Sequence, residues 1–559
     1  MACTWLVLAA VLRGLGHLVR LALGKADSRT GDWHAEAWMG WAASIVFLQI
    51  WHMFLPVDRR ALNVVCAAGV TGCAVLAVVG RRGPARNLGP MPVWMLIFAL
   101  TAFWLANHSV RQPAIRDSGL YHLNAVRWAA EYPVVPGLGN LHGRLAFNNS
   151  FFLYAAMLDV GPFAHKSHQL ASGLLMLLVV WRCLQGAAHV ALRKTQDNME
   201  LYYALFLAPV VTWCVTSGYA SSPSPDTAIY LLAVVAGGFL VAWESGDEQG
   251  AQSVYGLTWV AILAAAGVTV KLTFAVFAAA LLIAVSFRRW GRESANRPPA
   301  IIVPLIAMLL ALLPWMARGV IMSGYPFYPM ARFGFPVEWR IDEHALITQS
   351  EWIRSWARNP ALTPAETLGA WSWVWTWVKR VAAERTFNVV VPCALVLAGL
   401  AIRRFRKLPD AATGRQLRIA VAVPAVCLVA WFFSAPDPRF AGSFFWVLCI
   451  LVLAGSLTGI DREGLRISLL LYSTVILAQN VDPIRFLRPW NDPGVAHVAE
   501  VEARTTDSGL TVWVPKEGDL CWDAPLPCTP YFSRILELRD PTDMSKGFKK
   551  RRAQRTLED

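Results

Sequence analysis

One aspartate stands out in a polar stretch that immediately follows an apolar run. Asp117 lies within the segment from Arg116 to Trp128. A carboxylate there could act as a general base or give oxygen ligands to a divalent metal ion. An Asp at this place could equally cap a helix, which would put Tyr121, Asn124 and Trp128 on one face. We take Asp117 as the candidate catalytic carboxylate and leave the capping role open beside it.

Polar side chains continue to accumulate after Asp117, in a stretch that contains several glycines. So many hydrogen-bonding groups are unusual beside a membrane, where unpaired polar groups are costly to bury. We therefore expect these side chains to bind a polar substrate. They are Tyr121, His122, Asn124, Arg127, His142, Arg144 and Asn148.

Charged residues also stand at the ends of later apolar runs. One such residue is usually a snorkelling anchor, but several on one predicted face favour a functional site. Lys271, Arg318 and Arg439 could bind a phosphate or diphosphate. Asp226 could join Asp117 in holding a divalent metal such as Mg or Mn, or one of the two could be the base. Tyr325 and Asp437 complete the candidate substrate-binding residues.

These residues are positioned by apolar runs, each about long enough to cross a hydrocarbon core of roughly 30 Å. A backbone in lipid must satisfy its own hydrogen bonds, so the runs predict helices and an all-α polytopic membrane domain over residues 1–480. The first run is a weak spanning or interfacial helix, because it carries Arg13, His17 and Arg20. The roughly fourteen predicted spans are 2–23, 33–55, 61–80, 91–108, 168–191, 201–218, 226–243, 255–270, 272–288, 299–318, 388–402, 418–434, 440–458 and 465–480.

Basic residues cluster in the connections between alternate runs, and the positive-inside rule assigns those connections to the cytoplasmic side. The clusters are Arg81-Arg82 with Arg86, Arg193-Lys194, Arg288-Arg289 with Arg292, and Arg403-Arg404 with Arg406-Lys407. The long loops 109–167 and 319–387 then face outward, as does a small C-terminal segment, 481–559. The positive charges of Arg485 and Arg488 do not fit this outward assignment, because basic residues favour the cytoplasmic side.

The composition excludes a soluble nucleic-acid-binding protein. Of the 559 residues, 56% are hydrophobic and only 16% charged, whereas soluble domains carry about a quarter charged residues. The formal net charge of +14 comes from Lys and Arg in short connections, and no basic stripe interleaved with aromatics appears. The expected partner is therefore the lipid bilayer.

The cysteines point to the C-terminal segment. Eight of the ten lie in apolar stretches, where packing explains them. Cys521 and Cys528 stand in a polar context and could close a disulfide loop if that segment lies outside the cytosol. No Cys/His set has the spacing of a zinc site.

Tryptophan is abundant in the loop 319–387. Alternate placement over 371–377 suggests a strand, whereas on a helix the same residues would spread around the surface. They could anchor the loop at the membrane interface or form a platform for a lipid or sugar. The residues are Trp339, Trp352, Trp356, Trp371, Trp373, Trp375 and Trp377.

The first of these polar loops resembles that of GT-C glycosyltransferases, which include protein O-mannosyltransferases and the lipid A aminoarabinose transferase. The resemblance rests on an acidic residue after a spanning segment and on the Asp117–Tyr121 spacing. It implies a GT-C-like domain with amphipathic helices on its outer face. It also implies transfer of a sugar from a polyprenyl-phosphate donor to an extracytoplasmic glycan, lipid or protein. Asp117 would be the loop carboxylate, but Ser118 follows it instead of a paired acid, so metal-dependent and metal-free displacements both stay open.

A second resemblance covers most of the chain, and it is to a largely uncharacterised family of large multispanning proteins of the bacterial inner membrane. It implies a family rather than a reaction. The matching pieces lie at 48–52 with 55–56, 119–122, 136–142, 323–326, 436–440 and 521–531.

Two other functions fit the same sequence. One is a transporter or polymerase of lipid-linked sugars, although charges at segment ends argue against translocation. The other is a non-enzymatic envelope assembly protein that docks through the C-terminal segment 481–559.

Overall fold

The computed structural model describes residues 1–24, 32–79, 91–192, 197–244, 254–290, 302–384, 386–406, 418–457, 459–487 and 496–551. Fourteen of its helices fall on the fourteen predicted runs. Their bounds are α1 Ala2–Ala22, α2 Trp33–His52, α3 Arg59–Val79, α4 Met91–Ser109, α8 His168–Leu192, α9 Asn198–Thr216, α10 Pro225–Glu244, α11 Val254–Val270, α12 Ala275–Trp290, α13 Ile302–Ser323, α17 Val391–Phe405, α18 Arg418–Ser434, α19 Phe444–Leu457 and α20 Arg462–Asn480.

Seven helices among the described residues are long and apolar enough to cross a membrane, by length and composition. They are α1, α3, α8, α9, α10, α13 and the continuous helix Thr386–Phe405. Five shorter apolar helices accompany them. The chain is therefore a largely helical membrane protein, as the apolar runs predict.

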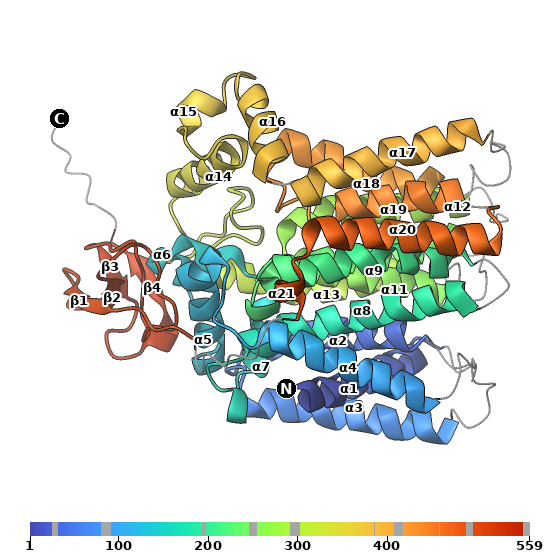
Figure 1. The fold of residues 1–559 in the computed structure, drawn as a ribbon. Helices are drawn as coiled ribbons and strands as arrows, with labels where there is room; N and C mark the ends of the chain where they lie inside the picture. Colours follow the sequence, from blue (N-terminus) through green and yellow to red (C-terminus); the bar gives the residue numbers. More distant parts are fainter. Residues whose placement is uncertain are drawn as a thin grey trace.

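The long helices form one bundle, and the shorter elements gather at one of its ends, at the left of Figure 1. The predicted loop 109–167 contains α5 Leu123–Glu131, α6 Leu138–Leu141 and α7 Phe151–Met157 there. The predicted loop 319–387 contains α14 Glu343–Arg358, α15 Pro364–Thr367 and α16 Trp373–Glu384, and α21 Pro483–Phe486 follows α20. The remaining short helices are η2 Ser118–His122, η3 Gly143–Phe147, η4 Gly161–Phe163, η5 Tyr219–Ser221, η6 Leu272–Phe274, η7 Thr386–Val390 and η8 Met544–Lys546.

Three of the four alternating tryptophans lie on helix α16 rather than on a strand, and Trp371 directly precedes that helix. Trp373 and Trp377 are buried, whereas Trp371 and Trp375 are exposed. Residues four apart share one face of a helix, so the buried pair is the inner face of α16. Two of the seven tryptophans singled out in this loop, Trp373 and Trp377, are therefore packing residues.

The polar residues of α1 are explained by α2. Glu36 is buried and accepts from Arg13 at 3.3 Å and from His17 and Arg20 at 3.0 Å each. A buried carboxylate needs such partners, because an uncompensated charge in the interior is strongly destabilising. The charges that make the first run look weak thus hold α1 against α2.

Glycines let the same two helices approach closely. A Cβ on Gly40 would collide with the backbone of Leu12, and one on Gly16 would collide with the backbone of Glu36. Small residues permit this approach, and between apolar helices the van der Waals packing that it allows is a main attraction.

We predict that Gly40→Ala separates α1 from α2, because backbone cannot move aside as a side chain can. The expected result is a clear loss of folded, monodisperse protein after detergent extraction, measured by size-exclusion chromatography and thermal unfolding. Gly369→Ala is the matched control, because a Cβ there meets nothing within 4 Å. Equal behaviour of the two variants would contradict the packing argument.

The C-terminal domain, residues 496–551, departs from the predicted all-α class. Strand β1 Val501–Thr505 pairs with β2 Thr511–Pro515, and β3 Leu536–Leu538 pairs with β4 Phe548–Lys550, both antiparallel. In the first pair Ala503 lies opposite Trp513. A disulfide joins Cys521 and Cys528, the pair that the sequence singles out.

The predicted orientation stays a prediction. Most of the basic residues that carry it lie outside the described residues, as does Arg488. These are Arg81, Arg82, Arg86, Arg193, Lys194, Arg292 and Lys407.

Candidate functional site

Five charged side chains from separate parts of the chain meet at the end of the bundle that carries the short helices. The Arg439 guanidinium bridges two carboxylates, with Nη1 2.8 Å from Asp117 Oδ2 and Nε 3.6 Å from Asp226 Oδ2. Arg144 Nη1 lies 3.4 Å from the other Asp117 oxygen, and Lys271 pairs with Asp226. We call these five residues the charge cluster; it contains three cations and two anions.

Each member of the charge cluster sits where a regular element begins or ends. Asp117 directly precedes η2, and Asp226 is in the first turn of α10. Lys271 is extended between α11 and η6, and Arg144 lies in η3. Arg439 follows α18 in the turn 435–443. These placements put the charges where the apolar bundle meets its polar end.

Asp117 occupies the predicted cap position but does not cap. Its side chain makes no capping hydrogen bond, and the helix opens as the π-helix η2 before it becomes α5. The carboxylate turns to the two arginines instead. The capping interpretation of Asp117 is therefore wrong, because charged donors replace the backbone amides as its partners.

The turn that carries Arg439 is held by Asp437 and by two tryptophans. Asp437 is buried, and one of its oxygens accepts from the Arg439 backbone amide at 2.9 Å. Trp377 donates to the carbonyl of Pro436 at 2.6 Å, and Trp431 donates to that of Asp437 at 2.7 Å. Asp437 thus positions Arg439 rather than joining the charge cluster.

Aromatic rings surround the cations. The Arg439 guanidinium lies 5.6 Å from the Trp356 ring and 5.4 Å from Phe440, and the Lys271 ammonium lies 4.7 Å from Phe440. Arg144 lies 5.9 Å from the Tyr121 ring. Cation–π contacts of this length limit how the cations can turn. Trp356 is 41% exposed, so one face of the site is an accessible indole.

The cluster keeps Asp117 ionised. Burial acts to raise the pKa of Asp117, but the positive charges around it, that of Arg439 first, together outweigh burial and hold that pKa below its usual value. Burial also acts to lower the pKa of Arg439, while Asp226 and Asp117 act to raise it, and the net shift is upward. Burial lowers the pKa of neighbouring His122 to about 4, so this imidazole is neutral at pH 7.

Several predicted substrate-binding residues contact the C-terminal domain instead. Asn124 donates to the carbonyl of Trp522 at 2.9 Å. Arg127 donates to the carbonyls of Asp523 and Ala524 at 3.2 and 3.0 Å. These bonds fasten the disulfide loop to α5, so the structure gives Asn124 and Arg127 a docking role.

The other candidates lie nearby without joining the charge cluster. The His142 ring is 6.5 Å from Tyr121 and 5.2 Å from Tyr531 of the C-terminal domain. Asn148 donates to the carbonyl of Trp315 at 2.7 Å, and Tyr325 donates to that of Ile341 at 3.2 Å. Arg318 is buried in a separate pocket.

The charge cluster does not fit a divalent metal ion. Asp117 and Asp226 are the predicted ligands, yet Arg439, Arg144 and Lys271 already occupy their oxygens. A metal ion bound there would face three positive charges. Among the described residues, no three His, Cys, Asp or Glu side chains converge as a metal-binding group.

The comparison with known families covers this whole site. Residues 1–446 match a family described as a domain of unknown function, DUF8201. The chain belongs to the DUF8201 family. The matched region includes all five cluster residues, while the C-terminal domain lies beyond it. The chain matches no curated protein and no solved structure.

In this DUF8201 protein the sequence does not mark Arg380 as a site residue, and it gives Trp356 no more weight than the other tryptophans of its loop. Arg380 Nη1 lies 3.8 Å from the buried carboxylate of Asp437, and Arg380 also donates to the carbonyl of Ala357. Arg380 stands three residues after Trp377, so helical spacing could have placed it on the same inner face of α16. No local signal pairs Trp356 with Arg439.

We predict that Arg439→Gln raises the pKa of Asp117, because burial remains while the largest favourable charge is lost. In the wild type the carboxylate should stay ionised until the pH falls below its usual pKa; in the variant protonation should begin at higher pH. Infrared titration of the protonated-carboxyl stretch measures this, with Asp117→Asn identifying the band. Exposed Lys379 on α16 provides the control, Lys379→Gln, which should leave the titration unchanged.

We also predict that Arg127→Leu loosens the disulfide loop without unfolding the bundle, because two hydrogen bonds to loop carbonyls are lost. Amide exchange in 519–524 should accelerate several-fold, measured by mass spectrometry in detergent. Arg504→Leu on β1 is the control, because Arg504 pairs only with Glu502 among the ion pairs described. Unchanged exchange in Arg127→Leu would rule out the docking role.

Proposed function

We propose that this DUF8201 protein is a membrane glycosyltransferase that moves a sugar from a polyprenyl-phosphate donor to an extracytoplasmic glycan, lipid or protein. The observation that carries the proposal is the bridge formed by Arg439 between Asp117 and Asp226. It combines an ionised carboxylate with cations that can bind phosphate, at the end of an apolar bundle. On the predicted orientation, this end faces away from the cytosol.

The cations supply a site for the donor phosphate. Arg439 and Arg144 can bind phosphate oxygens in a forked geometry, and Lys271 adds a compact positive charge. The neighbouring apolar helices suit a polyprenyl chain that remains in the bilayer. The exposed indole of Trp356, beside Arg439, offers an apolar face to the sugar ring.

The transfer itself would be a direct displacement. Asp117 accepts the proton of an acceptor hydroxyl as the hydroxyl oxygen forms a bond to the anomeric carbon. The bond from that carbon to the phosphate oxygen breaks, and its electron pair leaves with the polyprenyl phosphate. Arg439, Arg144 and Lys271 stabilise the charge that develops on this leaving group. The step needs no metal ion.

Donor binding would also make Asp117 a better base. In the free protein Arg439 holds the pKa of Asp117 down, which weakens its affinity for a proton. A bound phosphate would neutralise that cation and draw it away, leaving burial as the dominant influence on the carboxylate. The pKa of Asp117 would then rise, so the base becomes active when the donor is present.

We predict that Asp117→Asn abolishes transfer, with at least a 100-fold loss, because the amide cannot take the proton. Cells that lack the chain, complemented with wild type or variant, would be analysed by mass spectrometry of their lipid-linked sugars. The unused polyprenyl-phosphate sugar should accumulate in the variant strain and be consumed in the wild-type strain.

Two controls make this result specific. Asp540→Asn changes an Asp of the C-terminal domain whose carboxylate, among the described residues, accepts only from Thr542 within its own turn, and it should behave as wild type. Immunoblotting of membranes should show equal amounts of all three proteins. Full consumption of the sugar by the Asp117→Asn strain would contradict a catalytic role for Asp117.

A further inference from the structure

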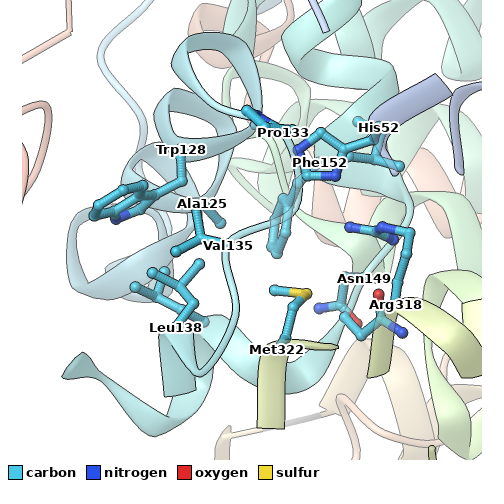
Figure 2. Close-up of a pocket in the computed structure, with 14 residues that line it drawn as sticks. His52, Ala125, Trp128, Pro133, Val135, Leu138, Asn149, Phe152, Arg318 and Met322 are labelled. Carbon is cyan, nitrogen blue, oxygen red and sulfur yellow. The ribbon is translucent and has the colours of Figure 1, made fainter. Parts of the chain in front are cut away.

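A second polar site lies inside the molecule, in a pocket between α2, α5, α7 and α13. Figure 2 shows Arg318 beside Asn149 and Met322, with Trp128 and Leu138 across the pocket. Apolar side chains make most of the wall. They are Val135, Leu138, Leu145, Phe152, Leu153 and Met322.

Arg318 carries a charge that the described residues do not compensate. It is 2% exposed, and its Nε and Nη1 atoms have no hydrogen-bond partner among those residues. Two other buried arginines of the bundle differ sharply. Arg182 donates to both oxygens of Glu200 at 2.8 and 3.0 Å, and Arg20 donates to Glu36 at 3.0 Å. A buried, unpaired guanidinium is strongly unfavourable, so a ligand that compensates it would gain correspondingly.

Three further polar atoms at this pocket have no hydrogen-bond partner in the described structure. They are Trp128 Nε1, Asn148 Oδ1 and His52 Nδ1. His52 Nε2 lies 3.1 Å from the carbonyl of Tyr132, so Nε2 carries the hydrogen of the neutral ring and Nδ1 is an acceptor. The pocket therefore combines donors from Arg318 and Trp128 with two acceptors.

This pocket is distinct from the charge cluster. Phe152 lines it and separates it from the cluster, with its ring 5.2 Å from His122 and 6.0 Å from Tyr121. Tyr121 in turn lies beneath Arg144, a member of the charge cluster. A ligand at Arg318 would therefore be divided from Asp117 by a layer of aromatic side chains.

We propose that the Arg318 pocket binds an organic oxyanion that carries a neighbouring hydroxyl group. Arg318 and Trp128 donate to the oxyanion, Asn148 and His52 accept from the hydroxyl, and the apolar wall covers the carbon atoms between them. A soluble hydroxy acid, a soluble phosphate ester and a glycerophospholipid headgroup all share this chemistry. The inference does not depend on the proposed sugar transfer.

Thermal unfolding of the purified full chain tests the site with three probes: 3-hydroxybutyrate, glycerol 3-phosphate, and phosphatidylglycerol in nanodiscs compared with phosphatidylcholine. At least one probe should raise the wild-type midpoint by several degrees, because a ligand that binds only the folded state stabilises it. The probe that acts identifies the source of the oxyanion. Arg318→Met, which keeps an unbranched apolar stem but removes the guanidinium and its charge, should abolish the shift.

Two variants keep the test decisive. Arg318→Lys retains a positive charge and should preserve a smaller shift. Arg182→Met destabilises the bundle by leaving Glu200 unpaired, yet it should keep the full shift, which separates lost binding from lost stability. The proposal is overturned if no probe shifts the wild type, or if Arg318→Met responds as strongly as the wild type does.

Discussion

The Arg439 guanidinium connects parts of the chain that are far apart in sequence, and the polar end of the molecule is organised around its two ion pairs. Asp117 precedes η2, Asp226 begins α10, and Arg439 follows α18, so the bridge joins three segments. Each carboxylate has two cationic partners, so the loss of one cation leaves another in place. The shared partners make the charge cluster a structural constraint as well as a candidate site.

The support for Arg439 extends outward through the aromatic helices. Asp437 fixes the turn by accepting from the Arg439 amide, while Trp377 and Trp431 fix the turn's carbonyls. The buried face of the tryptophan-rich segment therefore holds the charge cluster in place, and its other face is exposed. This division explains why α16 carries so many large rings in so short a length.

The C-terminal domain supports the helix that follows Asp117. Its disulfide loop receives hydrogen bonds from Asn124 and Arg127 on α5, only a few residues after Asp117. The position of η2, and with it the position of Asp117, is thus constrained from both ends. The domain lies outside the part of the chain that matches DUF8201, so this support is an addition to the family's matched region.

The helical membrane character can be predicted from the sequence, because the length and hydrophobicity of each run are local properties. The sequence also singles out the members of the charge cluster, since charges at the ends of apolar runs are conspicuous. Which of these charges meet depends on how the helices pack. Asn124 and Arg127 look like Arg144 in sequence, yet they dock a domain; Arg318 looks like Arg439, yet it lies alone in a pocket. Partner choice depends on contacts between segments up to several hundred residues apart, as with Asp117 and Arg439, and no local pattern encodes those contacts.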